Sequence, residues 1–487
     1  MPEATSDTSP SPTPPGSPAA PDTTRSPASP ASSMVGEGVV RGIDWKAAFP
    51  ALHLFRAFRI AIHPSKLLLA LVFLYLILGV GRGLDLLWPT AYRYPAVAYP
   101  LTELPSRPPS ASGGDLSGPF DVLLTWQLTQ LQGLVDAVIY LNLHDVPEQV
   151  YNLTLRPLAW TLSRHPVFAT LFGSVLLLAW AIFGGAIARI AAVHVARDEK
   201  ISMRNALRFA SGKLLSFLFA PVILFLFIGG LGFAIAVTHL VFYLPWGIGP
   251  ALAGFAFVLT LLAALVMTLA LFGTLGGFGL MYPTIAVEGT DAFDAISRSF
   301  SYFFARPWKL LFYSLIALVY GSLTYLFLKL FIFVLFTLIQ AFQVWFLTDS
   351  LRADYRLFFP PLDFRSLSYT PEHEAMSSLG LKVGASVVNF WFHLVVYALG
   401  AYAVSFFISA QTIIYYLLRL DVDVTELDDV YLEEADEDDI AEQTLPDAEP
   451  RAAPAGGPAA TTAAAATPPP PDHHDDPPTV GPSGPLA

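Results

Sequence analysis

The sequence predicts an all-α, polytopic membrane protein with about six transmembrane helices, interfacial amphipathic helices and disordered termini. Hydrophobic residues make up 54% of the 487 residues and charged residues only 14%, whereas soluble domains are about a quarter charged. The two ends of the chain, 1–40 and 421–487, hold 21 of the 41 prolines and few large apolar side chains. The part between them is therefore too apolar for a soluble enzyme, and we take 41–420 as the membrane domain.

The two ends are predicted to be disordered. Residues 1–40 are rich in Pro, Ser and Thr, so they cannot bury enough apolar surface to offset the entropy of ordering. Residues 421–487 are acidic and then rich in Pro and Ala, with a net charge of −16, which leaves +4 for the rest of the chain. Two roles stay open for the acidic tail: solubility with repulsion from anionic lipid, or docking of a basic cytoplasmic protein.

Spanning a bilayer takes about 20 mostly apolar residues. Six stretches meet this condition: 67–87, 166–190, 215–243, 250–280, 310–330 and 391–418. With the N-terminus inside, 68 inner flanking residues carry 13 Lys and Arg, whereas 140 outer residues carry nine. Because cytoplasmic loops are enriched in these cations, we expect both termini to be cytoplasmic in a plasma (inner) membrane, with outer segments at 88–165 and 331–390.

The apolar stretch around the fifth span is almost unbroken from 309 to 346. A helix of this length would measure about 57 Å, nearly twice the hydrocarbon thickness. Either one helix continues outside the bilayer, or a tight hairpin makes a seventh span. No Gly, Pro or Asn lies between 326 and 335, which favours one long helix.

A further helix is predicted outside the membrane, over 119–143, with Gly118 before it and Pro119 at its first position. Apolar residues recur along it at intervals of three and four: Leu124, Leu128, Leu131, Val135 and Val138. We expect this stripe either to pack on the extension 331–346 as a small cap over the bilayer, or to lie flat in the interface.

A short motif recurs where the chain enters the bilayer. The two copies match with identical spacing: His63, Pro64, Lys66, Leu67 and Leu68 correspond to Arg306, Pro307, Lys309, Leu310 and Leu311. A shorter echo, His165 and Pro166, precedes the second span. Proline suits the first position of a helix because its missing N–H is not needed there.

Amphipathic segments accompany these motifs. Before the second copy, Phe293, Ile296, Phe300 and Phe303 share one side of a short helix, opposite Asp294, Ser297, Arg298 and Ser301. Such helices can lie in the headgroup plane with their cations on lipid phosphate; the alternative is ordinary positive-inside flanking. The candidate headgroup contacts are Arg56, Arg59, Lys66, Arg197, Lys200, Arg204, Arg208, Arg298, Arg306 and Lys309.

Polar groups within the spans are few, and each is costly unless paired. Arg82 and Asp85, three residues apart, are expected to form an ion pair on the helix surface. Asn389 and His393, four apart, are expected to form a structural pair. A proton relay is the less favoured alternative for both. Glycines in the first and fourth spans, Gly273 and Gly277 among them, are explained by close helix contact.

One segment resembles a known group of domains. Pro283 ends a span, Glu288 follows, and the run 295–300 contains Arg298, Ser299 and Phe300 before a basic residue opens the next span. This pattern, over about 188–345, resembles bacterial multi-span membrane domains of unknown function, including the membrane domain attached to some glycerophosphodiester phosphodiesterases. The resemblance implies a helical membrane module; because the chain lacks the soluble phosphodiesterase domain, it implies no activity.

Signatures of known chemistry are absent from the sequence. The chain has no cysteine, no Walker lysine motif, no nucleophile elbow and no paired-histidine zinc helix. We therefore expect no enzymatic activity, no cofactor, no metal and no nucleic-acid partner. The leading hypothesis is an envelope module that organises lipid or anchors a partner. The alternative is a transporter or channel for an apolar or amphiphilic substrate.

Overall fold

The computed structural model describes residues 49–95, 116–245, 247–364, 367–369, 371, 376 and 378–432. The predicted tail 1–40 lies outside the described residues, as does the part of the acidic tail after 432. The chain divides into two units, Met1–His53 and Leu54–Ala487, and of the first only 49–53 are described. Apart from the bounds of η1, which begins in the first unit, everything below concerns the second unit.

The predicted all-α fold is confirmed, with six helices that are long and apolar enough to cross a membrane. In chain order they are α3 (Pro64–Leu87), the continuous helix α6–η3–α7 (Pro166–Ala179, Trp180–Gly184, Gly185–Arg197), α9 with η4 (Leu214–Thr238, His239–Tyr243), α10 (Ile248–Glu288), α12 (Pro307–Gln343) and α14 (Leu379–Asp423). The protein is thus a multi-pass membrane protein. Within the described residues, β-structure is limited to the two-residue antiparallel pair β1 (Tyr94–Pro95) and β2 (Leu116–Ser117).

Several spans are longer than the sequence suggested. α12 is one helix of 37 residues, about 55 Å long, which settles the choice between one long helix and a hairpin for this stretch. Its distal part does not need the helix 119–143 as a partner. Ile332 and Phe336 instead join a cluster with Phe359, Tyr369 and Phe392, contributed by the segment after α13 (Asp349–Phe358) and by α14.

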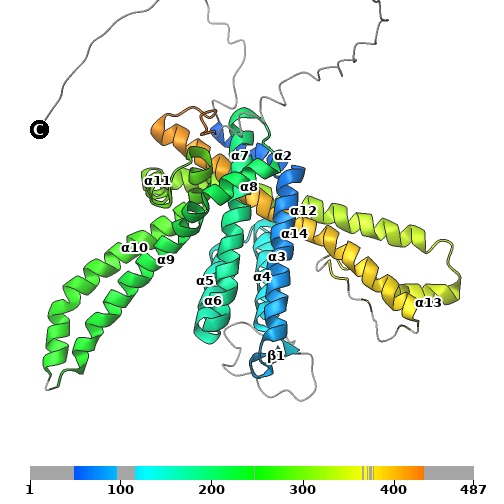
Figure 1. The fold of residues 1–487 in the computed structure, drawn as a ribbon, viewed down its shortest axis with the longest axis horizontal. Helices are drawn as coiled ribbons and strands as arrows, with labels where there is room; N and C mark the ends of the chain where they lie inside the picture. Colours follow the sequence, from blue (N-terminus) through cyan, green and yellow to red (C-terminus); the bar gives the residue numbers. More distant parts are fainter. Residues whose placement is uncertain are drawn as a thin grey trace, which may run out of the picture. The chain divides into compact units, whose positions relative to one another are not determined.

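The predicted helix 119–143 is present as α4 (Pro119–Ile139), with Gly118 at its N-cap and proline at its first position. It forms a hairpin with α5 (Val146–Arg164), in which the Trp126 indole donates to the carbonyl of Asn152 at 2.8 Å. The expectation of a cap over the bilayer is wrong. α4 contacts α3 and α12, and α5 contacts α6, so the hairpin lies beside these spans instead of covering their ends (Figure 1).

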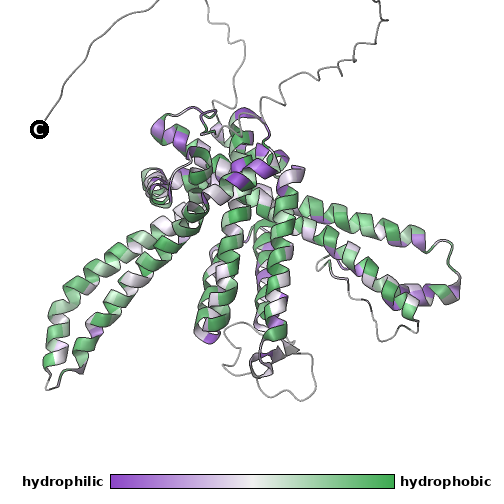
Figure 2. Ribbon diagram, viewed as in Figure 1, coloured by the Kyte–Doolittle hydropathy of each residue, from purple (hydrophilic) through white to green (hydrophobic). Residues whose placement is uncertain are grey.

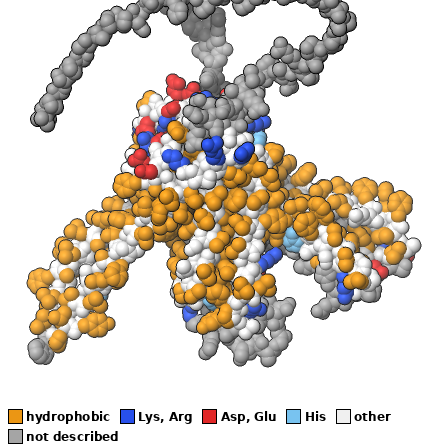
Figure 3. Space-filling model, viewed as in Figure 1, with side chains coloured by type: hydrophobic (Ala, Val, Ile, Leu, Met, Phe, Trp, Pro, Cys, Tyr) orange, Lys and Arg blue, Asp and Glu red, His pale blue; other side chains and the backbone are white. Residues whose placement is uncertain are grey.

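Shorter helices complete the described chain: η1 (Pro50–Phe55), α2 (Arg56–Ala61), η2 (Thr90–Tyr92), α8 (Met203–Gly212) and α11 (Ala292–Ala305). α8 packs on α7, and α11 packs on α10. Figure 2 shows hydrophobic residues along the spans. Figure 3 shows the side chains themselves, with many of the charged ones gathered at the end where Figure 1 places α7, α8 and α11. We call this region the charged end; it comprises residues 54–66, 189–213, 280–310 and 401–432.

The charged end contains the best-buried part of the protein. Every residue from Gly185 to Val195 of α7 is buried, and so is every residue from Leu280 to Val287 of α10. The last residues described, 424–432, belong here too, since the Tyr431 N–H donates to the carbonyl of Val287 at 2.8 Å. The predicted disordered tail therefore begins too early at 421, because 421–432 is held against the helices.

Candidate functional site

In the second copy of the recurring motif, the positive charges of Arg306 and Lys309 are paired with a carboxylate of the same chain. Arg306 is the N-cap of α12 and Pro307 its first residue. The Arg306 guanidinium lies 2.9 Å from the carboxylate of Asp421 at the end of α14, and Lys309 contacts the same carboxylate. These two predicted headgroup contacts therefore meet an acid of their own chain.

The first copy has the same backbone arrangement and different electrostatics. His63 is the N-cap of α3 and Pro64 its first residue. The side chain of Lys66 is fully buried, and its Nζ has no hydrogen-bond partner among the described residues. Burying an unpaired ammonium group costs on the order of several kcal/mol, so this lysine is not the exposed headgroup contact that the sequence suggested.

Two histidines lie close to Lys66. The rings of His63 and His194 are 5.9 Å apart, centroid to centroid, and the Nδ1 atom of each is buried without a partner in the described chain. Burial, and then the positive charges of Lys66 and Lys200, lowers the pKa of His63. We refer to Lys66, His63 and His194 as the Lys66 site.

A carboxylate beside this site, that of Asp198, is already engaged. Asp198 lies 3.6 Å from His194 Nε2, but its Oδ1 is 2.9 Å from Arg59 and 3.2 Å from Arg56. Burial raises the pKa of Asp198, and the two arginines more than offset this, so its pKa is below the ordinary value. Arg56 and Arg59 are thus paired internally, whereas Lys66 is not.

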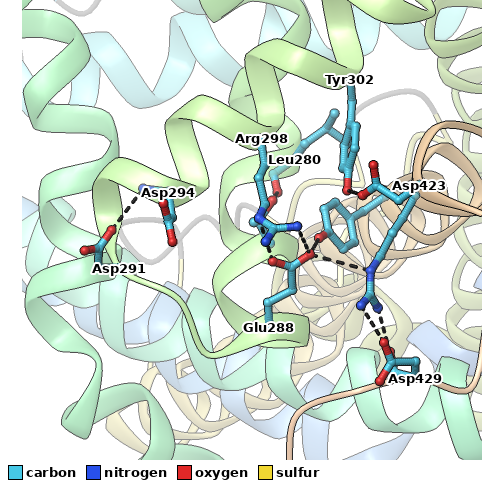
Figure 4. A network of polar contacts seen from close by, with 11 residues as sticks. Leu280, Glu288, Asp291, Asp294, Arg298, Tyr302, Asp423 and Asp429 are labelled. Carbon is cyan, nitrogen blue, oxygen red and sulfur yellow. Dashed lines mark hydrogen bonds and ion pairs between the residues drawn. The ribbon is translucent and has the colours of Figure 1, made fainter. Parts of the chain in front are cut away.

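Glu288, at the end of α10, is the centre of a second polar cluster (Figure 4). Its side chain is 8% exposed and lies 2.9 Å from Arg298 of α11 and 3.5 Å from Arg419 of α14. The hydroxyl of Tyr415 donates to the same carboxylate. With two guanidiniums and a phenol around it, Glu288 is a structural ion-pair centre, and Arg298 is not a free headgroup contact.

The same cluster holds the end of the described chain. Arg419 also contacts the carboxylate of Asp429 at 2.6 Å, and Tyr302 donates to Asp423. Nearby, Arg189 is fully buried, donates to the carbonyl of Ala286 at 2.7 Å and lies 4.3 Å from the ring of Phe209. Sequence reasoning missed this arginine, although its position at the end of a predicted span could have marked it.

α8 is amphipathic. Ala206, Phe209 and Ala210 are buried against the rest of the charged end. The four predicted cations of this segment are exposed: Arg197, Lys200, Arg204 and Arg208. Among the described residues, Arg197, Arg204 and Arg208 form no ion pair. Of the ten predicted headgroup contacts, these are the ones that face outward without an internal acid.

The aromatic side of α11 packs partly on protein. A β-carbon at Gly273 would lie 2.7 Å from the ring of Phe300, and one at Gly276 would lie 2.1 Å from the ring of Phe303. The prediction of close helix contact at Gly273 is therefore confirmed, and Gly277 likewise approaches the backbone of α11. In the first span the explanation fails for Gly79 and Gly83, which have open space beside them.

The two predicted intramembrane pairs take other forms. Asp85 does not pair with Arg82: its two carboxylate oxygens accept the backbone N–H groups of Phe120 and Asp121, each at 2.9 Å, at the start of α4. The ring of His393 bonds the backbone carbonyl of Asn389, four residues earlier, at 2.8 Å, and not its side chain. The role of Asp85 is structural, because a carboxylate at a helix N-terminus satisfies N–H groups that would otherwise be unpaired. The His393 contact lies within a single helix, α14.

The third echo of the motif is also structural. The His165 ring nitrogen Nε2 lies 2.7 Å from the hydroxyl of Tyr94, beside Trp88 and Trp160. Burial, and then Arg164, lowers the pKa of His165. This contact joins β1 to the residue between α5 and α6.

A pocket lies between α9, α10, α14 and η3. Its lining is mostly apolar and includes Trp180, Pro221, Tyr282 and Pro283, with the Gln411 amide at one side. Three irregularities meet there, since η3 is a π-helix and both prolines interrupt the backbone hydrogen bonding of their helices. The hydroxyl of Tyr282 is buried and has no partner among the described residues.

The described residues contain no group of three or more His, Cys, Asp or Glu side chains that could hold a metal ion. No curated protein and no solved structure matches the chain. The suggested likeness to a membrane domain of glycerophosphodiester phosphodiesterases therefore stays a prediction. A domain of unknown function, DUF7847, matches residues 122–410, more than half of the chain, and the protein belongs to this family.

Proposed function

We propose that this protein is a non-enzymatic scaffold of the plasma membrane that binds anionic lipid through α8 and anchors a basic cytoplasmic protein through its acidic C-terminal region. The observation that carries the proposal is that some of the predicted cations are paired with acids of the chain and others are exposed. Five of them, Arg56, Arg59, Arg298, Arg306 and Lys309, are paired with acids of the chain. The cations at the end of α7 and along α8 are exposed instead: Arg197, Lys200, Arg204 and Arg208.

The position of these exposed cations supports contact with lipid. They lie beside a helix whose apolar side is buried on α7, at the end of the spans that the distribution of Lys and Arg assigns to the cytoplasm. A cation near an anionic leaflet contributes about 1 kcal/mol. Both termini are placed on the cytoplasmic side in this proposal, as is the acidic stretch after 432.

The polar clusters support a structural role over catalysis. General acid–base chemistry needs a group that can exchange a proton with a substrate at hydrogen-bond distance. The buried carboxylate of Glu288 is surrounded by Arg298, Arg419 and Tyr415, and Asp198 by two arginines. Such compensated pairs join α10, α11 and α14, which is what a rigid scaffold requires.

The lipid role can be tested with the full-length protein in neutral detergent, by counting bound phosphatidylglycerol with native mass spectrometry. Replacement of Arg197, Lys200, Arg204 and Arg208 by glutamine should weaken the binding of the loosely held lipids at least tenfold. The matched control replaces four cations outside the charged end: Arg164, Arg352, Arg356 and Lys382. Equal losses in both variants would contradict the proposal.

The alternative function is transport of an apolar or amphiphilic substrate, and the pocket beside Tyr282 is the observation in its favour. Its lining is apolar, and the Tyr282 hydroxyl has no partner among the described residues; the cavity of about 20 Å³ would have to widen to admit a substrate. A proteoliposome assay with a fluorescent phospholipid separates the two functions. The scaffold proposal expects the rate of transfer between leaflets to equal that of protein-free liposomes, whereas a rate that falls on Tyr282→Phe substitution would favour transport.

A further inference from the structure

The two copies of the recurring motif provide an internal comparison. In the copy at α12, both cations meet the carboxylate of Asp421. In the copy at α3, the corresponding residues are His63 and Lys66, and neither is paired with an acid in the described chain. The backbone is alike in both, with an N-cap residue followed by proline, so the difference lies in the counter-charge.

We infer that the Lys66 site binds an anionic phosphate group, namely that of a phospholipid headgroup at the charged end. Three nitrogen atoms of this site are buried without hydrogen-bond partners in the described residues: Lys66 Nζ, His63 Nδ1 and His194 Nδ1. The two imidazole rings are 5.9 Å apart, and the positive charge of Lys66 acts on His63. An ammonium group and imidazole N–H groups are the donors that a phosphate accepts.

The surroundings favour an anion over a metal ion. Lys66 is fully buried and positively charged when protonated, and Lys200 adds to the positive field that acts on His63. The near carboxylate, Asp198, is neutralised by Arg56 and Arg59. A divalent cation would meet net repulsion here, whereas a phosphate would supply the charge that Asp421 supplies in the other copy.

The His63 side of the site lies at the surface of the charged end. His63 is half-buried, and the residue before it, Ile62, is exposed, as is Pro64. The lysine stem has four flexible bonds, so its ammonium group can move toward a bound phosphate. A lipid at this position would keep its acyl chains in the bilayer along α3, because Pro64 begins the span.

This inference deepens the lipid-binding part of the proposed function and rests on it for the choice of leaflet. It predicts a second, more specific site, separate from the exposed cations of α8. The substitutions R204Q and R208Q together should weaken the many weak contacts with phosphatidylglycerol. They should leave one tightly held lipid in place, because neither residue belongs to the Lys66 site.

The test uses delipidated full-length protein in neutral detergent, with phosphatidylglycerol, phosphatidylcholine and inorganic phosphate as separate probes. We expect one phosphatidylglycerol to bind, and K66M to weaken it at least tenfold. K66R should bind within about threefold of the unmodified protein, because it keeps the charge. The matched control, K309M, alters the corresponding residue of the other copy and should bind within twofold.

Inorganic phosphate that binds with the same dependence on Lys66, and competes with the lipid, would support the phosphate site with a free anion as its source. Unchanged binding in K66M, or an equal loss in K309M, would overturn the inference. H194Q gives a second measurement from another helix if K66M does not fold, and an affinity for lipid equal to that of the unmodified protein would then overturn it.

Discussion

The charged end and the opposite halves of the spans are built on different principles. At the charged end, α7 and the last turns of α10 bury every side chain over runs of eight or more residues, and ion pairs join α10, α11 and α14. Toward the opposite end, large apolar side chains face outward, such as Phe233 at 72% and Phe255 at 84% exposure.

This contrast shows where the protein specifies its own structure and where it relies on lipid. Apolar surface facing hydrocarbon has little drive to pack, because lipid tails are as apolar as leucine. Tight packing between membrane helices therefore needs small residues and polar contacts. Glycines of α10 and the Glu288 cluster provide both at the charged end.

The strongest test of this contrast is the substitution E288Q. It leaves Arg298 without its acid, and Arg419, which is 12% exposed, with Asp429 as its remaining acid, and breaking a buried ion pair typically costs about 3–5 kcal/mol. We expect a large loss of thermal stability in detergent, measured by tryptophan fluorescence. The control is D349N, whose partner Arg352 forms an exposed pair at the other end of the protein; its stability should hardly change.

Truncation distinguishes the ordered start of the acidic region from the rest. A chain ending after Leu432 should keep its stability, because it retains Asp421, Asp429 and Tyr431 and their contacts. A chain ending after Leu420 loses all three and should be destabilised by about 2–4 kcal/mol, as counter-charges and a backbone hydrogen bond are removed together. Equal stability of the two chains, measured by thermal unfolding, would show that 421–432 contributes nothing.

The chain that ends after Leu432 is also the variant with which to test whether the acidic stretch binds a partner. Because 421–432 is part of the fold, affinity capture should compare the full chain with one ending after Leu432. Capture of a basic cytoplasmic protein by the full chain alone would support anchoring through the acidic stretch. Capture by both chains would place the interaction elsewhere.

Substitutions of two glycines of α10 test the packing difference within one helix. Gly276 lies against Phe303, whereas Gly254 has open space around it. G276A should cost about 1–3 kcal/mol because the ring must shift, and G254A should stabilise by up to about 1 kcal/mol through higher helix propensity. Effects of the same sign on thermal unfolding would contradict the assigned packing.

The smallest expected effect concerns His165 at the end of the α4–α5 hairpin. Its pKa in the folded protein is lowered by burial and then by Arg164, so the unfolded chain takes up more protons as the pH falls below about 6.5. Stability should therefore decline from pH 7 toward pH 5. H165Q, which does not titrate, should decline less; the apparent melting temperature of both proteins across this range provides the comparison.

Much of the fold follows from composition and periodicity. The six spans, the long α12 and the helix after Gly118 were all predicted, because an apolar run of sufficient length must be helical in a bilayer and proline marks helix starts. The tertiary positions of the same residues were not predictable in this way. Asp85, expected to pair with a neighbour three residues away, caps α4 thirty-five residues later.

By itself the sequence determined that the chain is a helical, multi-pass membrane protein and where its cations lie along the chain, because hydropathy and helix starts are local properties. The tertiary structure alone decided which cations are compensated: Arg306 and Lys309 meet Asp421, and Arg298 meets Glu288, while Lys66 is buried without an acid. The physical reason is that a charge is stabilised by whatever lies within a few ångströms of it. In a bundle of long helices those neighbours can come from segments more than a hundred residues away, as Asp421 does for Lys309.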